Sequence, residues 1–244
     1  MLCSMKTKIR LFVDHPLAEA QSVPLGWDQA HYLFSVMRKS EGDYVALFNG
    51  KNGEWLAKID VAEKKQGVVR CLEMTKPQQN PPDIWLMFAP IKKARTDFIV
   101  EKATELGAAR IMPLQTDFTN SERIKRDRLQ NHAIEAAEQC GGTFVPEVTD
   151  MNQLEKLISD WPEDRFLLFC DESKVGERVG IQDLPTGKWA ILLGPEGGFS
   201  EKERKYMQAM QNSFSISLGP RILRTDTAAV AALTLWQNAL GDWA

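Results

Sequence analysis

Apolar and polar positions follow two different patterns along the chain, and the first occupies roughly the opening third. Three stretches there have the length and alternation of short strands, at residues 44–48, 54–59 and 67–72. Asn49 and Gly50, between the first two, form a hairpin-type turn signal. Residues 27–37 have helical spacing, with Asp28 as the candidate N-cap. This pattern predicts a small β-barrel that carries one helix.

The rest of the chain alternates between strands and helices. Apolar runs of strand length occupy residues 84–89, 110–114, 165–169, 188–193 and 213–218. Helical spacing occupies residues 93–106, 121–139, 154–160, 200–211 and 227–240. Gly107 is placed to end the first of these helices. Such alternation predicts a parallel sheet covered by helices, and a ligand of such a sheet binds outside the carboxyl ends of its strands.

A proline-rich segment separates the two patterns. Pro77, Pro81 and Pro82 lie within seven residues, so neither a helix nor a central strand runs through them. We therefore predict an α/β protein in three parts: a β-barrel at residues 1–76, a semi-rigid linker at 77–82 and an α/β domain at 83–244.

Composition narrows the function classes. The 244 residues are 43% hydrophobic and 26% charged, and the net charge of −3 neither favours nor excludes an RNA partner. No apolar run approaches the roughly 18 residues that span a bilayer, and we find no secretion signal. The four cysteines and three histidines are scattered without metal-ligand spacing, so we expect a cytoplasmic protein without a metal site. Spacing alone leaves open a catalytic cysteine or serine paired with a distant histidine.

Three strand ends in the α/β domain carry the candidate chemistry, at residues 168–172, 193–200 and 218–225. In the second, Gly197 and Gly198 allow close backbone approach, and Ser200 with Glu203 forms a capping box for the next helix. The phosphate-loop motif GxxxxGK[ST] and the dinucleotide motif GxGxxG are both absent, which disfavours the usual Gly-rich nucleotide folds. Spacing alone favours a plain strand-to-helix turn over a ligand loop.

Two arginines stand in the third strand end. Arg221 and Arg224 precede a helix rich in small residues. A guanidinium there could clamp a phosphate or polarise a base oxygen, and the alternative is a solvated surface charge. The alanines that follow indicate close helix packing, either internal or across a dimer.

Several segments together resemble one family. Residues 193–198 read LGPEGG, 218–228 read LGPRILRTDTA, 102–107 read KATELG and 136–141 read AAEQCG, while residues 31–38 and 42–50 match in the first domain. Their joint order is similar to the RsmE family, the 16S ribosomal RNA uracil-N3 methyltransferases of the SPOUT class. The resemblance implies a PUA-like RNA-binding β-barrel, a SPOUT α/β domain with a C-terminal trefoil knot, and a homodimer. Knots are exceptional, so the pattern by itself predicts none.

The resemblance also implies that the three strand ends enclose S-adenosyl-L-methionine. The expected cofactor-binding residues are Leu168, Phe169, Gly194, Pro195, Glu196, Gly197, Gly198, Leu218, Gly219, Ile222, Leu223, Thr227 and Ala228. Arg224 is the first candidate to stabilise charge on a uracil oxygen, Arg221 the second, and Glu196 the candidate proton acceptor. The expected phosphate contacts are Arg10, Arg38, Lys39, Lys92, Lys93 and Arg95.

The chain departs from the family pattern at two positions, and each departure removes an arginine. Gly142 stands where the family usually has arginine, and Asp117-Phe118-Thr119 stands where many members have Glu-Arg-Ser. These changes affect the expected RNA contacts and leave the cofactor site intact. The expected function is S-adenosylmethionine-dependent methylation of N3 of a specific uridine in 16S ribosomal RNA, on the assembled 30S subunit. The alternatives are a noncatalytic RNA-binding or ribosome-assembly protein and a SPOUT methyltransferase of another RNA.

Overall fold

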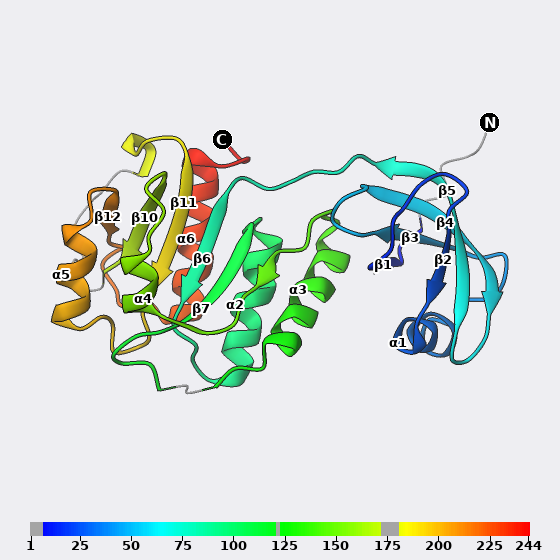
Figure 1. The fold of residues 1–244 in the computed structure, drawn as a ribbon, viewed down its shortest axis with the longest axis horizontal. Helices are drawn as coiled ribbons and strands as arrows, with labels where there is room; N and C mark the ends of the chain where they lie inside the picture. Colours follow the sequence, from blue (N-terminus) through cyan, green and yellow to red (C-terminus); the bar gives the residue numbers. More distant parts are fainter. Residues whose placement is uncertain (1–6, 121–122, 172–180) are drawn as a thin grey trace. The chain divides into compact units, whose positions relative to one another are not determined.

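The computed structural model describes residues 7–120, 123–171 and 181–244. The chain forms two compact units. In Figure 1 the ribbon is coloured along the sequence from blue at the N-terminus to red at the C-terminus. The first unit comprises Met1–Asn80 and Ala137–Val145, and the second comprises Pro81–Ala136 and Pro146–Ala244. The sequence places Ala137–Val145 in the α/β domain, whereas the structure groups this segment with the first unit, where Arg10 and Lys76 bind its backbone carbonyls.

The first unit is built on a five-stranded sheet. Its strands are β1 (Arg10–Phe12), β2 (Ser22–Leu25), β3 (Tyr44–Phe48), β4 (Glu54–Ala62) and β5 (Gly67–Lys76), in the order β1-β3-β4-β5-β2. The three central strands confirm the pattern in the sequence, while the short strands β1 and β2 have no counterpart in it. The register of β4 on β5 shifts at three places, and such irregularities bend strands around a core.

The helix of the first unit differs from its prediction in two respects. It consists of α1 (Trp27–Ala30) followed by a π-helical segment at His31–Val36. The N-cap is Gly26, which has the extended backbone that a cap requires, and Asp28 lies in the first turn instead. The expectation that Asp28 caps the helix is therefore wrong.

The second unit contains a seven-stranded sheet in which every pairing is parallel. Its strands are β6 (Ile84–Phe88), β7 (Arg110–Gln115), β8 (Glu147–Val148), β9 (Asn152–Gln153), β10 (Arg165–Cys170), β11 (Lys188–Leu193) and β12 (Ser213–Ile216). The main order is β12-β10-β11-β6-β7-β8, with β9 also paired to β7. The predicted parallel sheet is confirmed, and all its carboxyl ends face one edge.

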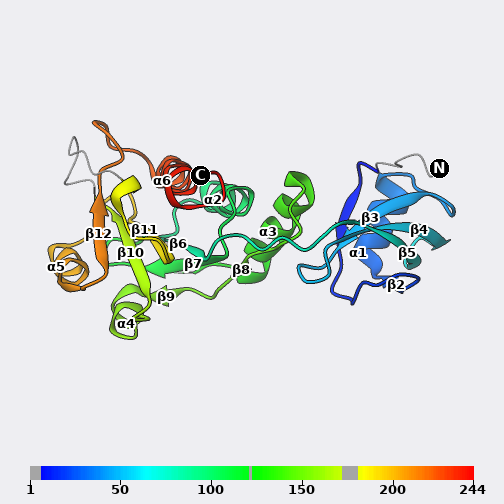
Figure 2. The same cartoon turned by 90° about the horizontal axis from the view of Figure 1, so that it is seen from above.

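Helices cover both faces of this sheet. They are α2 (Lys93–Glu105), α3 (Arg126–Cys140), α4 (Leu154–Ser159), α5 (Glu201–Ala209) and α6 (Thr225–Leu240). Figure 2 shows α2 and α6 on one face and α4 and α5 on the other. Gly107 follows α2 with φ 75° and donates its N–H to the Thr104 carbonyl, as predicted.

Helix α3 begins later than the sequence predicts. Residues 121 and 122 lie outside the described part of the chain, and residues 123–125 are not helical. The Lys125 carbonyl accepts the bond from Leu129 N–H that opens the helix. None of the helices that the structure describes combines the length and the apolar character needed to cross a membrane.

Candidate active site

A pocket lies where β10, β11 and β12 end, so the three strand ends singled out in the sequence come together. It encloses about 560 Å³ of space free of protein atoms, part of which is open solvent. Its lining consists of Cys170, Asp171, Leu193, Gly194, Pro195, Glu196, Ile216, Ser217, Leu218, Gly219, Arg221, Ile222, Leu223, Thr225 and Ala228.

The loop after β11 is shaped by its glycines. Gly198 has φ 67° and donates its N–H to the Pro195 carbonyl over 2.9 Å, which closes a tight turn. A Cβ added to Gly194 would lie 3.2 Å from the backbone carbon of Gly198, so the strand end and the turn touch backbone to backbone. The Gly194 carbonyl accepts the hydroxyl of Thr225 over 3.1 Å, which ties the loop to the start of α6. The capping box of Ser200 and Glu203 is confirmed.

The loop after β12 leaves its backbone groups open. Gly219 has φ 114°, and a Cβ added to it would meet nothing within 4 Å. Among the described residues, the backbone N–H groups of Leu218, Ile222 and Leu223 have no protein acceptor. Backbone donors beside a pocket ordinarily find a partner, so these groups are available to a ligand.

Nine of the residues expected from the sequence line the pocket: Gly194, Pro195, Glu196, Leu218, Gly219, Arg221, Ile222, Leu223 and Ala228. The others lie elsewhere. Leu168 and Phe169 are buried inside β10, and Gly197 and Gly198 belong to the turn after β11. Thr227 is exposed on α6, and Arg224 is the exposed residue that precedes α6.

Four lining residues belong to the three strand ends singled out in the sequence but were not expected as individual contacts: Cys170, Asp171, Leu193 and Thr225. Two further lining residues, Ile216 and Ser217, lie just before the third strand end. Most of these six residues are the last strand residue or the one after it. The signal that could have found them is position, because a ligand at the carboxyl edge meets the residues where strands end rather than those inside. Glu172, in the same sequence segment, lies outside the described residues.

The acids and bases of the pocket differ in burial. Asp171 is 2% exposed, and its carboxylate lies 3.3 Å from Nε of Arg204. Burial raises the pKa of the Cys170 thiol to about 12, so this thiol is protonated at neutral pH and is a poor nucleophile. Glu196, Arg221 and Arg224 are exposed, and within residues 7–120, 123–171 and 181–244 neither arginine has an ion-pair partner.

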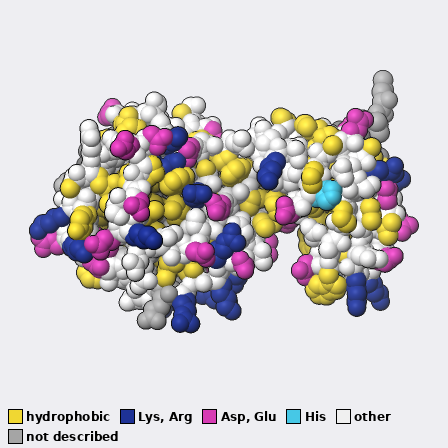
Figure 3. All heavy atoms as spheres, in the orientation of Figure 1, with side chains coloured by type: hydrophobic (Ala, Val, Ile, Leu, Met, Phe, Trp, Pro, Cys, Tyr) yellow, Lys and Arg dark blue, Asp and Glu magenta, His cyan; other side chains and the backbone are white. Residues whose placement is uncertain are grey.

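Among the residues expected to contact phosphates, some side chains are exposed and others are half-buried or paired. Lys92 and Lys93 are exposed at the start of α2, and Arg38 is exposed in the first unit. Figure 3 shows Lys and Arg side chains gathered over the starts of α2 and α3, where the sequence analysis did not single out the exposed Arg123 and Lys125. Lys39 is half-buried, and Arg95 lies 3.7 Å from the Asp226 carboxylate.

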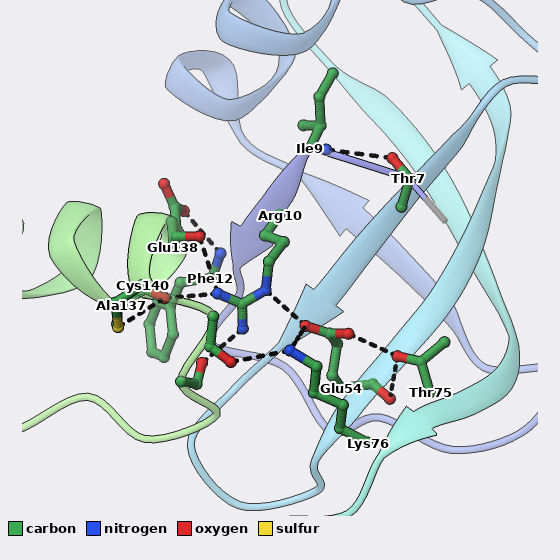
Figure 4. Close-up of polar contacts among 12 residues, drawn as sticks. Thr7, Ile9, Arg10, Phe12, Glu54, Thr75, Lys76, Ala137, Glu138 and Cys140 are labelled. Carbon is green, nitrogen blue, oxygen red and sulfur yellow. Dashed lines mark hydrogen bonds and ion pairs between the residues drawn. The ribbon is translucent and has the colours of Figure 1, made fainter. Parts of the chain in front are cut away.

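Arg10 lies in a different environment, shown in Figure 4. Its Nε donates to Glu54 over 2.6 Å, and its two Nη atoms donate to the carbonyls of Ala137, Glu138 and Gly142. Four of its five N–H groups are thus used, and the side chain is 10% exposed. Arg10 therefore holds the end of α3 on the first unit and has little left for a phosphate.

Glu54 completes this network. Burial would raise the pKa of its carboxyl, but hydrogen bonds from Thr75 and Arg10, with the charges of Arg10 and Lys76, lower the pKa below its ordinary value. The carboxylate therefore stays ionised although its side chain is only 7% exposed.

Comparison with known proteins assigns this architecture. A family model described as RNA methyltransferase domain matches residues 78–237, and one described as RNA methyltransferase PUA domain matches residues 26–70. A strand domain followed by a SPOUT-like parallel sheet with a pocket at its carboxyl edge is thus the architecture of an RNA methyltransferase.

Curated relatives narrow the assignment. Ribosomal RNA small subunit methyltransferase E of Rickettsia conorii is 31% identical to this chain, and the match covers 92% of this chain and 93% of the relative. The Bacillus subtilis protein of the same name is 30% identical, and the match covers 92% of this chain and 94% of the relative. The chain belongs to the ribosomal RNA small subunit methyltransferase E family.

Solved structures agree with this assignment. The Neisseria gonorrhoeae member bound to S-adenosyl methionine is 28% identical, with a TM-score of 0.87 over 97% of this chain and 99% of that one. A Legionella pneumophila structure in complex with the cofactor SAM is 30% identical, with a TM-score of 0.86 over 97% and 100%.

The pocket fits an adenosyl group on its own chemistry. Ile222, Leu223 and Ala228 supply apolar surface for the faces of a purine, and the open backbone N–H groups of the β12 loop supply donors for its edge. In the part of the chain that the structure describes, no three His, Cys, Asp or Glu side chains gather as metal ligands would.

Proposed function

We propose that this protein uses S-adenosyl-L-methionine to methylate N3 of a specific uridine in 16S ribosomal RNA, on the assembled 30S subunit in the cytoplasm. The pocket at the ends of β10, β11 and β12 carries the proposal, because the open backbone N–H groups of the β12 loop meet the β11 turn there. Arg221 lines this pocket and has no ion-pair partner among the described residues. Membership of the family supports the choice of substrate.

The cofactor would be held mainly by backbone atoms. Gly194 and Gly219 allow it to approach the chain closely, and the N–H groups of Leu218 and Leu223 would bond the adenine edge. When bound, S-adenosyl-L-methionine supplies an electrophilic methyl group on a positively charged sulfur. The chain itself must therefore position the acceptor nitrogen in line with that methyl group.

The arginines would act on the uracil. N3 of uracil carries a proton and is a poor nucleophile until that proton leaves, and the remaining negative charge spreads onto the ring oxygens. Arg224, together with Arg221, would stabilise this charge through N–H groups that donate to no acceptor within the described part of the chain. Glu196, exposed at the pocket wall, would accept the N3 proton.

The RNA would reach the pocket along the basic edge of the sheet. Lys92, the N-cap of α2, and Lys93, its first residue, follow the carboxyl end of β6 after a short loop, at the same sheet edge as the pocket. They would contact phosphates, as would Arg38 and Lys39 of the first unit. We omit Arg10 from this surface because its donors are already used. The target base must leave any stack to reach the methyl group.

A homodimer is part of the proposal. Ile222 is 74% exposed beside the pocket and Leu235 is 47% exposed on α6, so apolar side chains near the cofactor site are left for a second copy to cover. The trefoil knot formed by the C-terminal segment stays a prediction from the resemblance. Sedimentation of the purified protein measures the dimer directly.

The decisive experiment uses small ribosomal subunits from a strain that lacks this gene. The purified protein and labelled S-adenosyl-L-methionine should produce a single methylated uridine, mapped by mass spectrometry to N3. Label on transfer RNA alone would favour another RNA substrate. Transfer to no uridine would overturn the proposal, and a failure of the protein to bind the cofactor in calorimetry would favour a noncatalytic role.

A further inference from the structure

Phe118 is exposed beside the loop after β11, residues 194–198, which we call the cofactor loop. It follows β7, at the carboxyl edge of the sheet, and is 47% exposed. An exposed phenylalanine forgoes the stabilisation that burying its ring would give. Single exposed apolar residues are common, so exposure alone assigns Phe118 no role. What distinguishes Phe118 is how the chain around it is held.

Both neighbours of Phe118 are fixed by hydrogen bonds. Thr116 and Thr119 bond to each other through their hydroxyls over 2.8 Å, and the Thr119 N–H donates to the Thr116 carbonyl. Asp117 N–H donates to the Glu203 carboxylate over 2.9 Å, and the Asp117 carboxylate accepts the Ser200 hydroxyl. The turn is therefore bound to the same capping box that begins α5, which leaves little freedom for the backbone of Phe118.

The side chain of Phe118 lies beside the cofactor loop. A Cβ added to Gly197 would lie 3.4 Å from Cβ of Phe118 and 3.6 Å from its first ring carbon, which is ordinary van der Waals distance, so Phe118 is a neighbour of this glycine. Gly197 follows Glu196, which lines the pocket. Phe118 thus lies next to the cofactor loop, while nearly half of the residue faces solvent.

The surroundings suit a nucleic acid strand. The turn that carries Phe118 and the basic side chains at the starts of α2 and α3 follow parallel strands at the same sheet edge, and Lys92, Lys93, Arg123 and Lys125 are exposed there. A single strand is bound by basic side chains that track its phosphates and by aromatic rings on which its bases stack. This edge offers both.

We propose that Phe118 is the platform on which a base of the substrate RNA stacks when it leaves its own stack at the methylation site. Phe118 is a positioning residue: it fixes the strand so that the acceptor base faces the pocket. This inference rests on the proposed RNA methyltransferase function and adds to it a residue type that reads the flat face of a base rather than its phosphate.

The test compares three substitutions at one position with a control. Phe118→Ala removes the ring, Phe118→Leu keeps an apolar side chain without an aromatic face, and Phe118→Tyr keeps the face. Phe98→Ala is the matched control, because Phe98 is 40% exposed on α2 of the same unit. Each variant is assayed for methylation of subunits from the gene-deletion strain and for binding of a fluorescent single-stranded oligouridine.

Loss of one stacked base should weaken oligouridine binding and raise KM for the subunits by roughly 5- to 150-fold in Phe118→Ala. Phe118→Leu should resemble it, whereas Phe118→Tyr and Phe98→Ala should resemble the wild type, and cofactor affinity should be unchanged throughout. Wild-type behaviour of Phe118→Ala and Phe118→Leu would overturn the inference. So would a loss of RNA binding that accompanies dissociation of a dimer, since the ring would then be a contact between copies.

The two proposals fail differently. If the wild-type protein methylates no uridine of the subunits, the proposed function is wrong, and the oligouridine measurement still decides whether Phe118 stacks a base. If the wild type methylates them and all four variants behave alike in both assays, the function stands and the stacking role is wrong.

Discussion

Arg10 in the first unit and Arg221 beside the pocket of the second carry the same guanidinium group in opposite surroundings. Arg10 donates to one carboxylate and three carbonyls and also lies 4.5 Å above the Phe48 ring. Arg221 is exposed and has no hydrogen-bond or ion-pair partner among the described residues. An arginine whose donors are used stabilises the fold, whereas one whose donors are open is available to a substrate. Sequence alone offered both as RNA or substrate contacts.

Removing Arg10 should have the largest effect on stability. Arg10→Ala would leave the buried Glu54 carboxylate with the Thr75 hydrogen bond and, as its remaining cation among the described residues, Lys76 at 3.7 Å. It would also release the carbonyls at the end of α3. We expect a loss of about 3–5 kcal/mol in the first unit, measured by hydrogen exchange of its amides. The double variant Arg10→Ala/Glu54→Gln should recover part of the loss because no charge is stranded. If Arg10→Ala lowered the free energy of unfolding by less than about 1 kcal/mol, Arg10 would contribute no more than an exposed surface arginine does.

Removing Arg224 should leave the fold intact and slow the reaction. Loss of one donor to a developing negative charge costs about 100- to 1,000-fold in kcat, while a surface substitution changes stability by about 0.5 kcal/mol or less. Steady-state methylation of subunits measures the first, and urea unfolding the second. Arg221→Ala should show a smaller loss of the same kind. Near-normal turnover in Arg224→Ala with unchanged cofactor and RNA binding would remove Arg224 from the chemistry.

The cofactor loop should respond to substitution of Gly198. Its φ of 67° strains any side chain, so Gly198→Ala should cost about 1–2 kcal/mol and weaken cofactor binding in calorimetry. Gly42→Ala is the matched control: Gly42 has φ 88° and open space around it, but lies in the first unit. It should lose stability by a similar amount and bind the cofactor normally. Equal cofactor affinity in both variants would show that the Gly198 turn does not shape the site.

The smallest effect is the pH dependence of the first unit. Because folding lowers the pKa of Glu54, the ionised carboxylate stabilises the fold at neutral pH, and this contribution is lost as the pH falls from the ordinary value of 4.5 through the lowered one. The stability advantage of the wild type over Glu54→Gln should therefore be full at pH 7 and shrink below 4.5. Parallel urea titrations across this range measure it, and an advantage that grew towards acid would contradict the assigned direction.

Much of the second unit is visible in the sequence because its signals are local. Strands buried on both faces give continuous apolar runs, and Gly107 and Ser200 mark helix ends through contacts within a few residues. The expected cofactor residues that line the pocket lie in loops where glycine follows a strand end. Cys170 and Asp171 belong to the strand end at residues 168–172, but the residues expected from it were Leu168 and Phe169, whose side chains pack into the core.

The features that escaped prediction depend on distant partners. Strand β1 has three residues and exists through its pairing with β3, which a local pattern does not reveal. The role of Arg10 is set by carbonyls about 130 residues along the chain. The sequence shows Phe118 only as a phenylalanine in place of the family's arginine, because its nearness to Gly197 depends on the fold.

The grouping of Ala137–Val145 with the first unit has a consequence for synthesis. A chain that leaves the ribosome from its N-terminus completes the five strands well before it delivers this segment, about 65 residues after Asn80. At roughly 5–20 residues per second, Arg10 and Glu54 would wait about 3–13 s for the carbonyls that complete their network. The first unit is thus finished only after helix α3 has been made. A nascent chain stopped at residue 80 would carry the Arg10–Glu54 ion pair without the three carbonyls that Arg10 binds in the finished unit.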